Sequence, residues 1–378
     1  MASTAFAILL VLAVSYGGNW VKIRSKSWIF ERMPREGDHS AVQSAHTVPT
    51  PRIGGLAVVI AAALGVVMTV DAETAPMSLS LLVSVLPVLA AGLAEDLGFG
   101  VSPKGRLIAA AVSGVTIIAL QKFWITGVGF DGFDRIFLLA PLAIFLTLLW
   151  TSGLCHAFNL IDGLNGLAGF AAVITAGGLA AIAWLAGDRQ MVAMSLVMMA
   201  AVAGFLIHNW PRGRIFLGDG GAYSIGHLLA WTGLILLYRN PEVAGISVAL
   251  LYFWPVADTS WAIYRRRTRG RRTDQPDRMH FHQVAMRMLE IRFGLRGKRH
   301  ISNSLASALM APFIAVPMVA GVVFHQAPHM ALLALFLMGA GFVALYLSVY
   351  GFASGKRPAR QAEARPGQPE RPARIAAE

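Results

Sequence analysis

The sequence predicts an all-α integral membrane protein with about eleven transmembrane helices, its N-terminus outside and its C-terminus inside. Three observations support this fold class. Of the 378 residues, 56% are apolar and 14% are charged, whereas soluble domains have about 45–50% apolar and about 25% charged residues. Long apolar runs recur along the chain, and basic residues concentrate in alternate loops between them. This composition excludes an ordinary soluble enzyme and a disordered chain.

Eleven apolar runs approach the roughly 20 helical residues that cross a bilayer. They lie at 5–21, 53–71, 77–94, 107–121, 136–153, 166–187, 190–208, 221–238, 243–263, 302–324 and 329–352. No Lys or Arg precedes the first run and no clear cleavage site follows it, so we expect a retained helix and no signal peptide. Two short runs, 107–121 and 136–153, allow a different tilt or a partly re-entrant path.

The basic residues orient the chain. With the N-terminus outside, the inner segments hold all but four of the 32 Lys and Arg residues. The four outer ones are Lys122, Arg135, Arg189 and Arg239. The inner segments are 22–52, 95–106, 154–165, 209–220, 264–301 and the tail 353–378. We interpret the net charge of +12 as basic loops beside anionic lipid, with no nucleic-acid partner.

The chain divides into a membrane domain and a tail. Residues 1–352 form one polytopic domain whose inner loops carry most of the unusual polar residues. Residues 353–378 form a basic tail rich in Pro, Arg, Ala and Glu. The tail has no apolar periodicity, so we expect it to be disordered. The single cysteine, Cys155, excludes an intrachain disulfide.

Two adjacent carboxylates, Glu95 and Asp96, close the third apolar run. Like charges at a membrane boundary repel each other, and a cation or a phosphate-bound metal would relieve that cost. A solvated helix end is the alternative interpretation. Lys104 and Arg106 follow closely and either contact phosphates or anchor the next helix.

Asn159, Asp162 and Asn165 recur every three residues among glycines. On a helical turn this spacing brings the side chains to roughly one face. Their oxygens suit Mg²⁺ or a hydroxyl-rich group. A capped turn between two helices explains the same residues equally well.

Asp219 lies in a Gly-rich turn that opens the next helix. A helix N-terminus favours anions, and Asp219 would hold a metal that bridges phosphates. Arg212 and Arg214 are candidate phosphate clamps. The alternative is that Asp219 caps the helix.

Asp258 lies near the inner end of the ninth run, as a functional acid or as an interfacial residue paired with the arginines after it. We interpret the run from Arg265 to Arg267 as an anchor to anionic lipid. Arg278, His280 and His282 follow, and the two histidines project to one side if the segment is extended. They would bind phosphate or a uracil-like group, whereas a zinc site has little support because no third ligand is near.

These carboxylates, glycines, arginines and histidines converge on one membrane face. Such a site suits a phosphate-bearing substrate held by Mg²⁺, and the membrane points to a lipid as one substrate. Two other classes stay open. A proton-coupled transporter predicts polar residues at mid-bilayer on several runs, and a catalytically idle membrane scaffold would keep the same fold.

Five motifs in order resemble the polyprenyl-phosphate N-acetylhexosamine-1-phosphate transferases, membrane enzymes that begin bacterial lipid-linked glycan synthesis. The resemblance runs from about His46 to about Arg287. Glu95-Asp96 falls where the family has an Asp-Asp pair. The other motifs are 46–55, the first inner-loop motif; 159–167, similar to Asn-x-x-Asp-Gly-x-Asp-Gly-Leu; 216–221, similar to Phe-x-Gly-Asp-x-Gly; and 277–282, similar to Asp-Arg-x-His-x-His.

The resemblance implies a phosphoglycosyltransferase that acts at the cytoplasmic face of the bacterial inner membrane. It would transfer HexNAc-1-phosphate, with GlcNAc expected as the sugar, from a UDP-sugar to undecaprenyl or decaprenyl phosphate and release UMP. UDP-MurNAc-pentapeptide is the alternative donor. The implied cofactor is Mg²⁺, with Mn²⁺ as a substitute, and a homodimer stays open.

The resemblance also implies roles for single residues. Asp219 and the amide oxygen of Asn159 would bind Mg²⁺, Asp96 helped by Glu95 would position the lipid phosphate or the metal, and Asp162 would hold the nucleotide or sugar. Whether Asp96 acts as a base, a nucleophile or a positioning group stays open. The residues expected to bind substrate are His280, His282, Arg278, Lys104, Asn165 and Arg214.

Two positions depart from the family pattern. Glu95 replaces the first Asp of the acidic pair and reaches one methylene further. Asn165 replaces the second Asp of its motif, so that one negative charge is lost. Both departures bear on the sugar specificity.

Overall fold

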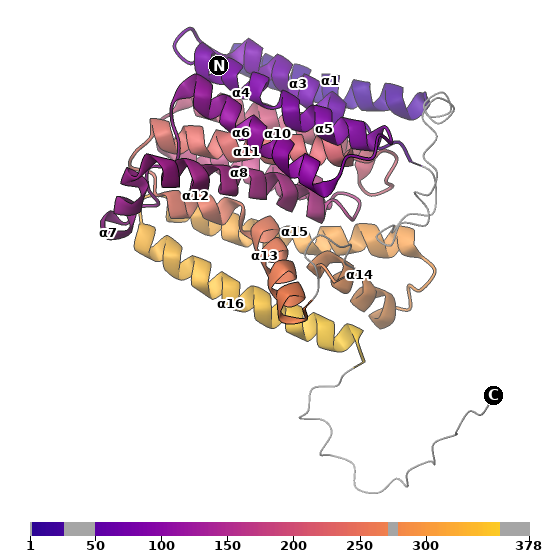
Figure 1. Ribbon diagram of the computed structural model, residues 1–378. Coiled ribbons are helices and arrows are strands. Elements are labelled where there is room, and N and C mark those ends of the chain that lie inside the picture. The colour runs from indigo at the N-terminus through magenta and orange to yellow at the C-terminus, as the bar shows by residue number, and fades with distance from the viewer. Residues whose placement is uncertain (1, 26–49, 271–278, 356–378) are drawn as a thin grey trace, which may run out of the picture.

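The computed structural model describes residues 2–25, 50–270 and 279–355, and across these ranges the chain is helical with no strand. The long helices lie roughly side by side in a layered bundle (Figure 1). The helices are α1 (Ala2–Arg24), α3 (Gly54–Thr69), α4 (Ala75–Ser84), α5 (Leu86–Asp96), α6 (Pro103–Gln121), α7 (Asp131–Asp134), η1 (Arg135–Leu138), α8 (Ala140–Ile161), α9 (Leu167–Leu185), α10 (Arg189–Asn209), α11 (Gly218–Arg239), α12 (Gly245–Leu251), α13 (Phe253–Thr268), α14 (Phe281–Arg292), α15 (Arg299–Val323) and α16 (Pro328–Ala353).

All eleven predicted runs contain helix, but within the described residues fewer than eleven helices reach the length of a crossing. Within the described ranges, nine helices are long and apolar enough to cross a membrane, or ten if the bent pair α12 and α13 counts as one crossing. The predicted tail lies outside the described residues from 356 onward. The runs at 107–121 and 136–153, which allowed a re-entrant path, belong to α6 and α8 and are long enough to cross.

Two runs account for the difference in number. Helix α3 has only 16 residues, and the chain at its start bonds to the segment before α11: the Phe216 N–H donates to the Pro51 carbonyl, and the Gly54 N–H donates to the Phe216 carbonyl. The run at 243–263 breaks at Tyr252, and the two halves make an angle of 80°. Pro255 lies just after the break, where its missing N–H and its ring oppose a continuous helix.

Helix α11 lies at the centre of the bundle and packs against α3, α5 and α8. Two glycine pairs allow its first turn to approach its neighbours closely. A Cβ on Gly55 of α3 would lie 2.0 Å from the Cα of Gly221, and a Cβ on Gly92 of α5 would lie 2.6 Å from the Cα of Gly220. The start of α11 is therefore held between α3 and α5.

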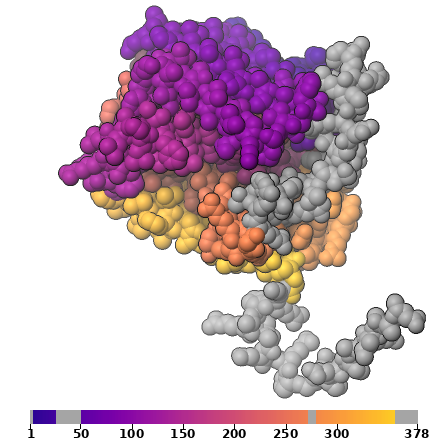
Figure 2. Space-filling model, viewed as in Figure 1, coloured from indigo at the N-terminus to yellow at the C-terminus, as the bar shows by residue number. Residues whose placement is uncertain are grey.

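The end of α5 lies toward the right of the bundle in Figure 1, and α14 lies below it on the same side. The bonds of Asp219 join the start of α11 to the ends of α5, α6 and α8. At the bundle's other side, α13 lies between the main body and α16 (Figure 2). His208 and His227 are buried at helix contacts, within hydrogen-bond distance of the Tyr16 carbonyl and of the Ser84 hydroxyl.

Candidate functional site

Asp219 is the centre of the polar site. Its Oδ1 accepts a hydrogen bond from Asn159 Nδ2 at 3.1 Å, and its Oδ2 pairs with the Arg106 guanidinium. The preceding residue, Gly218, has φ +77°, and a Cβ there would lie 1.9 Å from the Arg52 carbonyl oxygen. Only glycine fits this turn, which sets Asp219 at the start of α11.

Asp96 supports the first turn of α11. Its Oδ1 accepts the Asp219 N–H at 2.9 Å, and its Oδ2 accepts the Gly220 N–H at 2.8 Å. The first N–H groups of a helix have no partner within the helix, so this buried carboxylate caps them. Glu95, the residue before it, lies close enough to Arg106 for their charges to interact.

Arg106 belongs to the same cluster as Asp219. Besides its ion pair with Asp219, its guanidinium lies 6.0 Å from the centre of the Tyr223 ring. The Tyr223 hydroxyl lies 3.3 Å from His156 Nδ1. Sequence reasoning missed His156 and Tyr223, although His156 stands three residues before Asn159 and so shares its face of α8.

Asp162 follows α8 directly and is half-buried. Burial raises the pKa of its carboxyl to about 7, while the positive charge of Arg52 opposes the rise and the negative charge of Asp219 adds to it. Asp162 is therefore within electrostatic reach of both groups. Arg52 lies within the first inner-loop motif, but sequence reasoning gave it no role.

The histidine segment is fixed by α13. His280 Nδ1 lies 2.8 Å from Asp258 Oδ2, and the Phe281 N–H donates to Asp258 Oδ1 at 2.8 Å. The segment enters α14 at Phe281, yet the two rings remain on one side, since His280 and His282 stack at 5.7 Å. Asp258 is buried and pairs with His280, so it is no interfacial partner of the arginines.

His282 connects this segment to the loop after α8. A Cβ on Gly163 would lie 2.5 Å from His282 Nε2, so glycine is needed for the approach. Burial lowers the pKa of His282 to about 4, which keeps its ring neutral near pH 7. The residue after Asp162 and the histidine pair are thus in direct contact.

Arg265 corrects one expectation. It was interpreted as a lipid anchor, but it is 8% exposed, and its Nη1 donates to the Met279 carbonyl and the Tyr346 hydroxyl, both at 2.8 Å. A guanidinium within an apolar bundle is stable where such partners satisfy it. Arg267, two residues on, is exposed.

The other predicted substrate-binding residues differ in burial, and one lies outside the described residues. Asn165 is buried, and its Nδ2 donates to the Pro211 carbonyl at 3.0 Å, which ties two loops together. Lys104 at the start of α6 and Arg214 before α11 are exposed. Arg278, like His46 and Asp277 of the sequence motifs, lies outside the described residues.

The donor set around Asp219 fits a magnesium ion that is shared with phosphate. Across the described ranges, no group of three or more His, Cys, Asp or Glu side chains is arranged to hold a metal. Asp219 nevertheless provides a carboxylate at this point, and the Asn159 amide lies against it through Nδ2. Mg²⁺ commonly binds one or two carboxylates and completes its shell with water and substrate phosphates.

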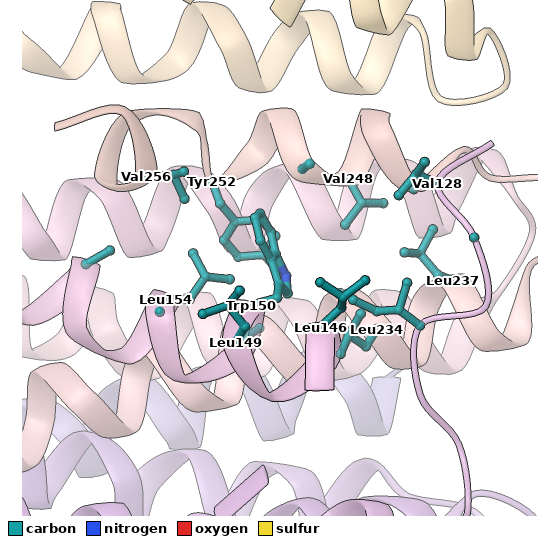
Figure 3. A pocket seen from close by; sticks show the side chains of 18 of the residues that line it. Val128, Leu146, Leu149, Trp150, Leu154, Leu234, Leu237, Val248, Tyr252 and Val256 are labelled. Atoms are coloured by element: carbon teal, nitrogen blue, oxygen red, sulfur yellow. The ribbon is translucent and has the colours of Figure 1, made fainter. Parts of the chain in front are cut away.

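An apolar cavity of about 510 Å³ lies between α8, α11, α12 and α13 (Figure 3). Its lining on α8 runs from Leu146 to Ala157, two residues before Asn159. At 1.5 Å per residue this face is about 16 Å long. Leu234, Tyr252 and Val256 are among the side chains on the facing helices. The cavity and the polar site thus share α8, but Ala157 and Asn159 lie on nearly opposite faces of that helix.

The molecule is thus a helical bundle with helices long enough to cross a membrane, a carboxylate and arginine site at the start of α11 and an apolar cavity within it. Comparison with known proteins gives the family. The glycosyl transferase family 4 profile matches residues 78–237, and a Bacillus subtilis relative is 31% identical over 256 residues, 66% of this chain and 69% of the relative. The chain belongs to glycosyl transferase family 4, as its motifs predict.

The similar proteins are sugar-phosphate transferases. The B. subtilis protein is a probable undecaprenyl-phosphate N-acetylglucosaminyl 1-phosphate transferase. An Escherichia coli K12 undecaprenyl-phosphate alpha-N-acetylglucosaminyl 1-phosphate transferase is 26% identical over 65% of this chain and 66% of its own length. A Mycolicibacterium smegmatis decaprenyl-phosphate N-acetylglucosaminephosphotransferase is 29% identical over 73% of this chain and 72% of its own. The matches span about two thirds of each relative.

Proposed function

We propose that this protein transfers GlcNAc-1-phosphate from UDP-GlcNAc to a polyprenyl phosphate and releases UMP. The observation that carries the proposal is the position of Asp219 at the start of α11, between Asn159 and Arg106. The names of the relatives support both the sugar and the lipid.

The reaction exchanges one phosphorus–oxygen bond for another. An oxygen of the lipid phosphate attacks the sugar-linked phosphorus of UDP-GlcNAc, and the bond from that phosphorus to the UMP oxygen breaks. A lipid phosphate is already ionised near neutral pH, so no strong base is required. The site's main task is therefore to hold two phosphorylated substrates in line and to offset their charge.

Asp219 and Asn159 are the residues that would hold Mg²⁺, or Mn²⁺ in its place. When bound, the ion supplies positive charge against the diphosphate and the departing UMP phosphate. Arg106 adds a fixed positive charge at the same carboxylate. Asp96 holds the turn that carries Asp219, so we assign it a positioning role.

The nucleotide-sugar lies toward the histidine segment in this proposal. His280 and His282 bind it together with Arg278, while Asp162 faces the sugar or nucleotide and Glu95 supports Arg106. Lys104 and Arg214 are exposed cations available to its phosphates. Asn165 acts indirectly, because its amide holds the loop that carries Asp162 and Gly163.

The polyprenyl chain occupies the apolar cavity, with its phosphate at the Ala157 end. The arrangement of basic loops supports an N-terminus outside and a site that faces the cytoplasm of a bacterium. The protein then works in the inner membrane at the start of a cell-envelope glycan pathway.

Release of UMP by the purified full-length protein in detergent tests the proposal. The reactions contain undecaprenyl phosphate, Mg²⁺ and one of several UDP-sugars, including UDP-GlcNAc and UDP-MurNAc-pentapeptide, with Asp219→Asn as the inactive control. We expect UMP that depends on lipid, metal and UDP-GlcNAc. Preference for the pentapeptide donor would overturn the sugar assignment, and no UMP from folded protein with any donor would favour the scaffold.

A further inference from the structure

Outside the Asp219 cluster, the buried carboxylate of Asp258 joins α13 to the histidine segment. We infer that Asp258 is a positioning residue that orients His280 toward the nucleotide-sugar, an inference that rests on the proposed function for the identity of that ligand. Asp258 is 1% exposed and His280 2% exposed, so their bond is shielded from water.

Both oxygens of Asp258 are engaged. Oδ2 faces His280 Nδ1 and Oδ1 accepts the Phe281 N–H, so one carboxylate fixes both the ring and the backbone beside it. A carboxylate only accepts hydrogen bonds, so Nδ1 of His280 carries a proton. Nε2 is then the ring atom left to meet a ligand, and it is buried with no hydrogen-bond partner in the part of the chain that the structure describes.

A second contact holds the other side of His280. Arg265 lies seven residues after Asp258, two helical turns on, and so on the same face of α13. It donates to the Met279 carbonyl, and the Tyr346 hydroxyl of α16 donates to the same oxygen at 2.9 Å. The residues before and after His280 are thus both tied down.

The orientation of His280 extends to the rest of the site. Its ring stacks on His282, whose Nε2 lies against Gly163 in the loop that carries Asp162. The opposite face of α13, which includes Val256, Ser260 and Ile263, lines the apolar cavity. One helix therefore supports the histidines with one face and contacts the cavity with another.

Asp258→Asn is the informative substitution, because it keeps the side-chain size and one acceptor for the Phe281 N–H. The amide nitrogen of Asn cannot accept a hydrogen bond from His280 Nδ1. Either this bond is lost or the His280 ring changes tautomer. We expect the Kd for UDP-GlcNAc with Mg²⁺ to rise at least about tenfold. In a His280→Gln background, the same substitution should change Kd less than twofold, because Asp258 acts through His280.

Arg265→Ala and Arg267→Ala form a matched pair on the same helix. The buried arginine should weaken UDP-GlcNAc binding several-fold, and the exposed one should leave it unchanged. Gel filtration and thermal unfolding establish that each variant is folded. If Asp258→Asn is unstable, the difference in UDP-GlcNAc affinity between Arg265→Ala and Arg267→Ala is the test instead. An equal loss of affinity in the His280→Gln background would overturn the positioning role.

Nitrogen NMR of protein labelled with ¹⁵N-histidine separates this inference from the proposed function. His280→Gln assigns the signal. Nδ1 of His280 should be protonated in the native protein and change in Asp258→Asn, whether or not the protein releases UMP. Absence of UMP release and of UDP-GlcNAc binding would refute the proposed function, whereas an unchanged His280 signal in Asp258→Asn would refute the Asp258–His280 linkage.

Discussion

Asp96 and Asp219 are joined through the backbone: Asp96 accepts the N–H groups of Asp219 and of Gly220, so one acidic residue holds the turn that presents the other. This relationship explains why two carboxylates lie together at the end of the bundle. It also separates their roles, because Asp96 is engaged with the helix while Asp219 meets Asn159 and Arg106.

Asp96→Asn should therefore reduce stability as well as activity. An amide accepts with only one oxygen, so one N–H of α11 loses its partner, at a cost of about 1 kcal/mol or more. We expect a lower unfolding temperature in detergent and a reduced kcat. Asp219→Asn should abolish turnover with little loss of stability. An Asp96→Asn protein that unfolds like the native one, yet is as inactive as Asp219→Asn, would give Asp96 a chemical role.

Arg106→Ala should change the metal dependence of the reaction. Arg106 pairs with the Asp219 carboxylate, which would also hold Mg²⁺, so its removal should lower the Mg²⁺ concentration for half-maximal rate. The loss of a positive charge at the phosphates should lower kcat by about 10²-fold. Titration of UMP release with Mg²⁺ measures both effects. Lys122→Ala, which removes an exposed cation at the other end of the same helix, is the control, and equal behaviour of the two variants would contradict the assignment.

The carboxyl of Asp162 should make the metal-free protein less stable as pH rises. Its pKa lies at about 7 in the folded chain against an ordinary 3.8, mainly because of burial. The folded state then holds the proton more tightly than the unfolded state, so stability falls between about pH 4 and 7. Thermal unfolding from pH 5 to 8 should show this slope in the native protein and a flatter one in Asp162→Asn. Identical slopes in the native protein and in Asp162→Asn would refute this effect of the Asp162 carboxyl.

Gly153→Leu should block lipid without disturbing the nucleotide-sugar. Gly153 lines the apolar cavity, and a Cβ there would meet nothing within 4 Å, so a larger side chain would fill the cavity instead of clashing. Leucine also favours helix over glycine. We expect a higher KM for undecaprenyl phosphate and an unchanged KM for UDP-GlcNAc. Gly339→Leu on α16 has the same open surroundings and is the control.

The apolar runs in the sequence predicted where the helices lie better than they predicted how many helices reach the length of a crossing. Apolar runs report that a segment is buried in lipid or protein, and every predicted run contains helix. They do not report where a helix breaks, so the 80° bend at Tyr252 and the shortness of α3 were missed. Both depend on contacts with distant segments or on a proline beside the break.

The candidate site was likewise predicted in part from the sequence. Asn159, Asp96 and Asp219 stand in recognisable motifs, and the structure brings them together. Arg265 was assigned to lipid because a run of arginines after an apolar stretch usually anchors a membrane helix. Its partners, Met279 and Tyr346, lie 14 and 81 residues away in sequence. Long-range partners of this kind leave no signal in local spacing.

The most direct test of the central claim follows the sugar-linked phosphorus atom of the donor. The purified protein is given Mg²⁺, undecaprenyl phosphate and UDP-GlcNAc that carries ³²P in the sugar-linked phosphate. Transfer of GlcNAc-1-phosphate predicts that the label moves into the lipid fraction while unlabelled UMP is released. Label that stays in water-soluble UDP, with only the sugar appearing on the lipid, would contradict it.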